Sequence, residues 1–192
     1  MQLDLTVKQR LMEVATDLLQ ETGGNPGAIT ARAIAERAGV SVGLMNYHFQ
    51  SKEHLLRLCV QRVIQQVVEG FVPPGGGPGE DGQRLAAWAN AVWDFLQAHP
   101  GVSRYSILDD LQQDSPASNT VRTQRGFARA LTQGDGQRQA LVAFALTSAL
   151  QMAFLCPNTA REALGVDLTQ PEARVAWVAS LAALLCGGAG EA

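Results

Sequence analysis

The residues with the most distinctive chemistry in this chain lie between positions 30 and 52, and they are side chains suited to contacting DNA. An asparagine amide can form two hydrogen bonds with adenine, and apolar side chains can touch the methyl group of thymine. Tyrosine and histidine can donate hydrogen bonds to phosphates, and glycine lets a helix approach a backbone closely. One run without an acidic residue supplies all of these groups: Val42, Gly43, Leu44, Asn46, Tyr47 and His48. These residue types predict a surface that binds DNA.

Two short helices joined by a tight turn would present these side chains on one face. Thr30 is a good N-cap for the first helix, and Gly39 stands where a helix ends in a left-handed residue. Ser41 then caps a second helix that runs to about Phe49. This is the construction of a helix-turn-helix unit, whose second helix enters the major groove. The residues predicted to point inward and hold the two helices together are Ile34, Ala35, Ala38, Val40, Met45 and Phe49.

Two other interpretations use the same residues. The run from Gly39 to Gly43 matches the Gly-x-Ser-x-Gly turn that exposes the nucleophile of many hydrolases, but that turn needs a strand before it. An Ala-rich helical segment precedes Ser41 here, so we expect Ser41 to be a helix cap. Arg32 could pair with Glu36, one helical turn later, and this pairing would not exclude contact with DNA.

The remainder of the chain is predicted to be helical, and the fold class all-α, because no segment alternates apolar and polar residues as a strand does. Thr6 and Gln9 have capping-box spacing, which predicts that the first helix begins at Thr6. The Gly- and Pro-containing residues at 23–27 end this helix, and those at 73–79 form the clearest break in the chain. Further helices are expected at about 51–72, 81–98, 102–113, 116–132, 137–156, 158–164 and 171–186.

Charge supports a nucleic-acid partner less well than side-chain chemistry does. The chain of 192 residues has a formal net charge of −3, whereas phosphate binding usually leaves a basic surface. A helical ligand-binding protein or enzyme that never meets DNA is therefore the competing class. The first 66 residues are close to neutral, and to attract DNA their cations would have to gather on one face: Lys8, Arg10, Arg32, Arg37, Lys52, Arg57 and Arg62.

The sequence at 38–56, Ala-Gly-Val-Ser-Val-Gly-Leu-Met-Asn-Tyr-His-Phe-Gln-Ser-Lys-Glu-His-Leu-Leu, resembles the signature of TetR/AcrR-family transcriptional regulators. The spacing of Thr30 and Ile34 before it is similar too. The resemblance is specific over about residues 6–60 and architectural beyond them. Asn46 departs from the commoner pattern, which has an aromatic residue there. The resemblance implies an N-terminal three-helix bundle with a helix-turn-helix, followed by a C-terminal helical ligand-binding and dimerisation domain.

The resemblance also implies a function: a sequence-specific DNA-binding regulator, a repressor that a small-molecule effector releases from its operator. Thr30 and Arg32 would contact the DNA backbone or an adjacent base, and Tyr47 and His48 would hold phosphates. Lys52 would add a cation at a helix N-terminus that already favours an anion. The complete predicted set of DNA contacts is Thr30, Arg32, Ser41, Val42, Gly43, Leu44, Asn46, Tyr47, His48 and Lys52.

Two domains are predicted, a DNA-binding module at 1–50 and a regulatory domain at 51–192, joined through the helix at 51–72. The apolar helix at 140–156 and the last helix are the expected interface of a homodimer, which would bind a near-palindromic operator. An apolar or amphipathic effector would bind the regulatory domain. Its candidate contacts are Trp88, Val92, Tyr105, Phe127, Gln151 and Trp177, although ordinary core is the favoured interpretation of the aromatic residues.

The sequence predicts neither a metal site nor a cofactor, and it assigns no catalytic residue. Cys59, Cys156 and Cys186 are far apart and lack Cys-x-x-Cys spacing, which argues against a zinc site or a disulfide framework. No membrane partner is expected, because the most apolar run, at 140–156, contains polar residues and is better explained as a core helix. A cytoplasmic location is predicted, since the N-terminal residues do not resemble a signal peptide.

Overall fold

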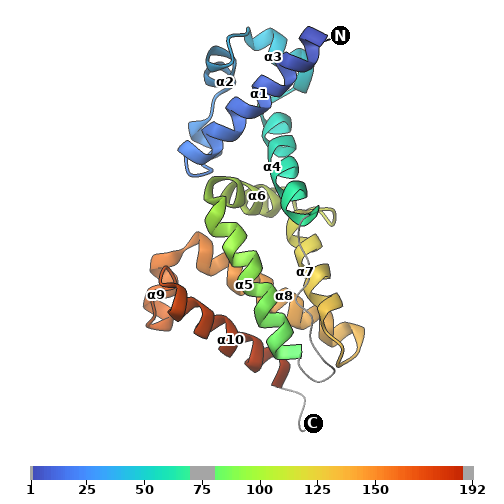
Figure 1. Ribbon diagram of the computed structural model, residues 1–192, viewed down its shortest axis with the longest axis vertical. Coiled ribbons are helices and arrows are strands. Elements are labelled where there is room, and N and C mark those ends of the chain that lie inside the picture. The colour runs from blue at the N-terminus through green and yellow to red at the C-terminus, as the bar shows by residue number, and fades with distance from the viewer. Residues whose placement is uncertain (1, 70–80, 188–192) are drawn as a thin grey trace. The chain divides into compact units, whose positions relative to one another are not determined.

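The computed structural model describes residues 2–69 and 81–187, and every regular element in these ranges is a helix (Figure 1). The prediction of an all-α fold is therefore confirmed. The chain divides into two compact units. The first unit combines the residues up to 71 with 98–112, and the second combines 72–97 with the residues from 113 onward.

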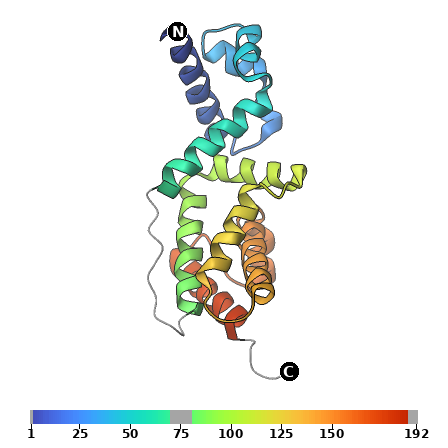
Figure 2. The same ribbon diagram turned by 90° about the vertical axis from the view of Figure 1, so that its right-hand side faces the viewer.

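The first unit is built from one long N-terminal helix and the short helices that follow it. α1 packs against α2 and α4, and α3 packs against the same two helices (Figures 1 and 2). Leu11, Ala15 and Leu19 repeat every four residues along α1 and are fully buried, as expected for one face of a helix. The elements of this unit are α1 (Gln2–Glu21), the 3₁₀ turn η1 (Pro26–Ala28), α2 (Ala31–Arg37), α3 (Val42–Phe49), α4 (Lys52–Glu69) and α6 (Pro100–Gln113).

The helix-turn-helix predicted from local signals is present. The Oγ1 atom of Thr30 accepts a hydrogen bond from the backbone N–H of Ala33 at 3.0 Å, and Ser41 Oγ accepts one from Leu44 N–H at 3.1 Å. Gly39 has a φ of +66° in the turn between α2 and α3, a conformation that glycine adopts without steric cost. Both N-caps and the left-handed turn residue therefore lie where the sequence placed them.

The predicted start of the first helix was wrong. α1 begins at Gln2, so Thr6 lies inside the helix and does not cap it. Capping-box spacing marks a start only where the preceding residues leave the helical conformation, and the residues at 2–5 include neither glycine nor proline to force this.

α6 belongs to the first unit, although sequence reasoning placed it in the regulatory domain. The backbone N–H of Gly101 donates to Gln20 Oε1 at 3.1 Å, and a Cβ atom added at Gly101 would overlap the carbonyl oxygen of Leu19. The first turn of α6 therefore touches the last turn of α1 closely. The boundary between the two packed units therefore differs from the predicted division at residue 50. That division separates a DNA-binding module from a regulatory domain, and it stays a prediction.

The second unit has its own apolar core. α8 packs against α7, α9 and α10, and α5 contributes Leu85, Ala89 and Trp93 to the same core. The helix expected at 116–132 is shorter, because Ser118 caps it by accepting from Val121 N–H. The break predicted at 73–79 lies outside the described residues. The helices of this unit are α5 (Asp81–Ala98), α7 (Asn119–Ala130), α8 (Gly136–Leu155), α9 (Pro157–Leu164) and α10 (Pro171–Gly187).

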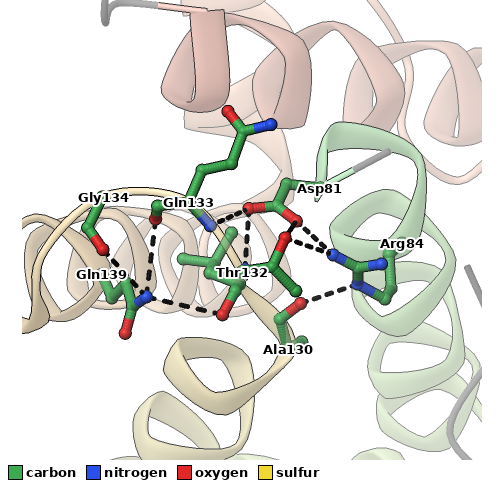
Figure 3. A network of polar contacts seen from close by, with 8 residues as sticks. Asp81, Arg84, Ala130, Thr132, Gln133, Gly134 and Gln139 are labelled. Carbon is green, nitrogen blue, oxygen red and sulfur yellow. Dashed lines mark hydrogen bonds and ion pairs between the residues drawn. The ribbon is translucent and has the colours of Figure 1, made fainter. Parts of the chain in front are cut away.

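A buried carboxylate joins the N-terminus of α5 to the connection between α7 and α8 (Figure 3). Asp81 is 5% exposed, and its Oδ2 atom accepts from the backbone N–H groups of Thr132 and Gln133, both at 2.9 Å. Its Oδ1 atom accepts from the Thr132 hydroxyl at 2.7 Å and forms an ion pair with Arg84. Burial alone would raise the pKa of Asp81, but these hydrogen bonds and the neighbouring Arg84 outweigh it and lower the pKa.

α8 is the one helix of the described segments that is long and apolar enough to cross a membrane by length and composition. This is weak evidence, because core helices of soluble proteins have the same composition. α8 is only partly the core helix that the sequence predicts. Leu146 and Leu150 are buried in the second core, whereas Leu141, Phe144 and Met152 are exposed.

Candidate nucleic-acid interface

α3 has one face buried in the first unit and one face exposed. Met45 and Phe49, four residues apart, are 0% and 2% exposed, and they fix the helix against the core. Ile34, Ala35 and Ala38 on the α2 side of the turn are buried as well, and Val40 is half-buried. The residues predicted to point inward therefore do so.

The opposite face of α3 carries apolar and hydrogen-bonding side chains in solvent. Tyr47 is 79% exposed, and Val42 and Leu44 are 37% and 38% exposed. Gly43 and Asn46 are exposed beside them, while His48 is half-buried, with its ring centroid 5.2 Å from that of Tyr47. Exposed tyrosine and leucine on a helix that is otherwise well packed are typical of a binding surface.

The start of α2 adds further polar groups to the first unit's surface. Thr30 and Ser41 each use an oxygen lone pair as a helix cap, so each hydroxyl keeps its proton for another acceptor. Arg32 is exposed, and within the part of the chain that the structure describes it forms no ion pair with Glu36. The alternative pairing left open by the sequence is therefore not adopted.

The hydrolase interpretation of Ser41 is excluded by the elements around it. α2 and a left-handed glycine precede Ser41 where a nucleophile turn would need a strand. The Ser41 oxygen is engaged as the N-cap of α3. Ser41 is thus a helix cap, as the Ala-rich segment before it indicates.

Several of the cations of the first unit are held by acidic side chains or backbone carbonyls of the protein itself. Arg37 on α2 donates to Glu21 at 2.6 Å, and this hydrogen bond lowers the pKa of the Glu21 carboxyl. Arg57 donates to Asp109, and Lys52 donates to two backbone carbonyls. Of the cations predicted from the sequence, those that are exposed and form no ion pair with described residues are Lys8, Arg10, Arg32 and Arg62.

This geometry coincides with the match to a known family. Residues 11–59 match the profile of bacterial regulatory proteins of the tetR family, a range that runs from α1 through η1, α2 and α3 into α4. The exposed face of α3 and both caps lie inside the matched range. Residues 11–59 of the chain thus belong to the tetR family.

The curated relatives to which the chain is similar are regulators by name. It is 31% identical over 131 residues to the HTH-type transcriptional repressor KstR of Rhodococcus jostii (strain RHA1), covering 65% of this chain and 59% of that protein. It is 39% identical over 64 residues to the HTH-type transcriptional regulatory protein RaaS of Mycobacterium tuberculosis, covering 33% and 29% of the two chains. The chain thus spans less than two thirds of the length of each relative.

Solved structures agree with the tetR-family fold. A TetR-like transcriptional regulator from Rhodococcus sp. RHA1 superposes with a TM-score of 0.64 at 22% identity, covering 95% of this chain and 96% of that chain. A tetR-family regulator from Streptomyces coelicolor superposes with a TM-score of 0.58 at 23% identity, covering 94% and 79%. At these identities the likeness concerns the fold alone.

The predicted effector contacts are divided between the two units. Tyr105 is 3% exposed in the core of the first unit, where burial raises its pKa to about 12. The others belong to the second unit. There Trp88 and Phe127 lie 6.2 Å apart between ring centroids, and Gln151 Nε2 donates to Thr120 Oγ1 at 2.9 Å. Trp177 packs edge-on against Trp93 at 6.0 Å, and Val92 is half-buried in the same core.

Sequence reasoning missed where some polar groups find their partners. Lys52 donates to the carbonyls of Pro26 and Ile29, and no sequence pattern marks a backbone carbonyl as a partner. Asp109, the partner of Arg57, lies 52 residues further along the chain, too far for a spacing rule to find it.

Proposed function

We propose that this tetR-family protein is a sequence-specific DNA-binding transcriptional repressor that acts as a homodimer. The observation that carries the proposal is the outer face of α3. A tyrosine that is 79% exposed stands beside two exposed apolar residues on a helix that Met45 and Phe49 anchor in the core. A rigidly held helix with such a face fits the major groove, because groove contacts need a fixed helix and side chains that reach base edges.

The face divides into groups that would read bases and groups that would hold the backbone. Asn46 is the residue that would pair with adenine, and Val42 and Leu44 would meet thymine methyl groups. Tyr47 and His48 would donate to phosphates, which fix the register of a protein on the duplex. The remaining proposed contacts around these groups are Thr30, Arg32, Ser41 and Gly43.

A second copy of the chain is the proposed partner of the second unit. Leu141, Phe144 and Met152 on α8 are 66%, 59% and 54% exposed, and Val175 and Leu184 on α10 are 46% and 75% exposed. Monomeric proteins rarely leave so many large apolar side chains exposed on two helices. A two-fold dimer would present two copies of α3 to the halves of a near-palindromic operator.

The protein is proposed to repress transcription and to be released from DNA by an effector. The word repressor in the name of one relative supports repression over activation. An apolar or amphipathic effector that binds the second unit more tightly in the DNA-free arrangement would weaken DNA binding by the same factor. Trp88, Phe127 and Gln151 are its proposed contacts. The protein would act in the cytoplasm, where its operator is, without a metal or cofactor.

Selection of bound sequences from random double-stranded DNA tests the proposed function. Enrichment of a near-palindromic site, confirmed by fluorescence anisotropy, is the expected result. Tyr47→Ala should weaken binding to that site by about tenfold or more, with an unchanged circular dichroism spectrum. Absence of any enriched site would favour the competing class, a helical ligand-binding protein, which the net charge of −3 supports.

A further inference from the structure

Lys52 stands at a position that disfavours its charge. It is the first residue of α4, and the N-terminus of a helix carries partial positive charge. An ammonium group at this end of a helix therefore needs an anion or carbonyl oxygens close by. A DNA phosphate is the anion that the sequence predicts for Lys52, but the first unit itself supplies oxygen atoms at this position.

Three oxygen atoms of the protein surround the Lys52 ammonium group. Nζ donates to the carbonyl oxygen of Ile29 at 2.8 Å and to that of Pro26 at 3.0 Å, and Glu53 Oε1 lies 3.5 Å away. An ammonium group has three N–H donors and no acceptor. Two of these donors are used by the carbonyl oxygens, and Glu53 is an ion-pair partner beside them. The Lys52 side chain is only 20% exposed, whereas that of Glu53 is 54% exposed.

The two carbonyls belong to the segment that leads into α2. Pro26 begins η1, and Ile29, which is fully buried, directly precedes the N-cap residue Thr30. Hydrogen bonds with an ionised donor are shorter and stronger than neutral ones. Lys52 therefore ties the start of α4 to the segment 26–29 and so sets the position from which α2 begins.

We propose that Lys52 is a positioning residue for the DNA interface and not a phosphate ligand. It holds the segment 26–29, and with it Thr30 and the first turn of α2, against the start of α4. This inference rests on the proposed function, because the interface that it positions is the proposed DNA surface. Binding sites lose affinity when supporting residues let contact groups move by even half an ångström or so.

The salt dependence of DNA binding distinguishes positioning from phosphate contact. Lys52→Met keeps an unbranched side chain of nearly the same length and removes the ammonium group with its charge. Lys8→Met is the matched control, because Lys8 is the other lysine of the chain and lies exposed on α1. Both variants and the unaltered protein are titrated against the selected operator by fluorescence anisotropy, over roughly 50 to 200 mM salt.

Positioning predicts that Lys52→Met weakens binding about tenfold at every salt concentration, with the slope of log affinity against log salt unchanged. Lys8→Met should leave affinity within about twofold of the unaltered protein. Loss of about 0.9 from the slope for each phosphate contact removed would overturn the proposal. So would an equal loss of affinity in both lysine variants, which would indicate only a change in net charge.

Amide hydrogen exchange in the DNA-free protein provides an independent measurement. The N–H groups of Gly27 and Ala28 donate to the side chain and carbonyl of Asn25, at 3.0 and 3.1 Å. Lys52→Met should speed their exchange at least tenfold and leave that of Met45 in α3 unchanged. Unchanged exchange at Gly27 and Ala28 would overturn the proposal, whatever happens to DNA affinity.

Failure of the proposed function and misfolding of Lys52→Met can each be distinguished from failure of the positioning proposal. If the unaltered protein selects no DNA, the proposed function fails, and the exchange measurement still decides whether Lys52 holds the segment 26–29. If Lys52→Met does not fold, Lys52→Arg takes its place. Arginine binds phosphates as well as lysine does, so full affinity in Lys52→Arg with faster exchange at Gly27 would overturn the proposal, whereas lower affinity with faster exchange would support it.

Discussion

Arg57 on α4 donates from Nε to Oδ2 of Asp109 on α6 across 2.9 Å. The hydrogen bond to Asp109 is the main reason that the pKa of Arg57 is raised. Asp109 is largely covered, with 16% of its side chain exposed, and Arg57 is 37% exposed. Together with the close approach of Gly101 to Leu19, this pair fastens α6 to the helices that carry the proposed DNA face.

A double-mutant cycle should detect this fastening. Arg57→Gln and Asp109→Asn are each expected to lower the free energy of unfolding by about 1 kcal/mol, because the pair is partly open to solvent. The double variant should lose less than the sum of the two, with a coupling energy of about 0.5 to 1 kcal/mol in urea unfolding. Strict additivity would mean that the pair adds nothing to stability.

The helix-turn-helix was predictable because its signals are local. Thr30, Gly39 and Ser41 act on neighbours within four residues, and each took the predicted role. The membership of α6 in the first unit depends instead on Gln20 and Gly101, 81 residues apart, and no spacing rule reaches so far. The position of Tyr105 was not predictable either, because a tyrosine can line a ligand cavity or pack in a core, and its residue type does not distinguish the two.

Asp81 should be the most costly carboxylate to replace in the second unit. Asp81→Asn would place an amide against the N–H donors of Thr132 and Gln133 and leave Arg84, which is 10% exposed, without its anion. We expect a loss of roughly 3 to 5 kcal/mol in unfolding free energy at about pH 7, as for other broken buried ion pairs. Asp114→Asn, an exposed position with a φ of +44° that asparagine tolerates, is the control and should change stability little.

The cost of Asp81→Asn should also depend on pH. Because the folded pKa of Asp81 is lower than its unfolded value, its ionised form is favoured in the folded state. Its contribution to stability is therefore complete above the unfolded pKa, near 3.9, and is lost as the pH falls through the lower folded value. The difference between the unaltered protein and Asp81→Asn should shrink when unfolding is measured at about pH 3. A constant difference would show that the carboxylate charge is not what matters.

A matched pair of substitutions tests the dimer. Leu141 on α8 and Leu111 on α6 are both 66% exposed, but only Leu141 lies on the proposed interface. Leu141→Glu should give a monomer in light scattering at micromolar concentration, because burying an unpaired carboxylate between subunits is unfavourable. Leu111→Glu should remain dimeric. If both variants keep the mass of the unaltered protein and that mass is a dimer, the interface lies on another surface.

Gly43 offers a test in which stability and DNA binding should change in opposite directions. A Cβ atom added there would meet only Ser41 Oγ, at 3.8 Å, so the fold has room for alanine. Because glycine is a poorer helix former, Gly43→Ala should keep or raise the unfolding free energy, by up to about 1 kcal/mol. The same methyl group would lie on the outer face of α3 and would keep the helix away from DNA, so affinity should fall about tenfold or more.

Gly136→Ala, at the first residue of α8 with open space around it, should leave operator affinity unchanged in the same anisotropy titration. If Gly43→Ala binds the operator as tightly as the unaltered protein, then the first turn of α3 does not approach the duplex, and Gly43 must be removed from the proposed contacts.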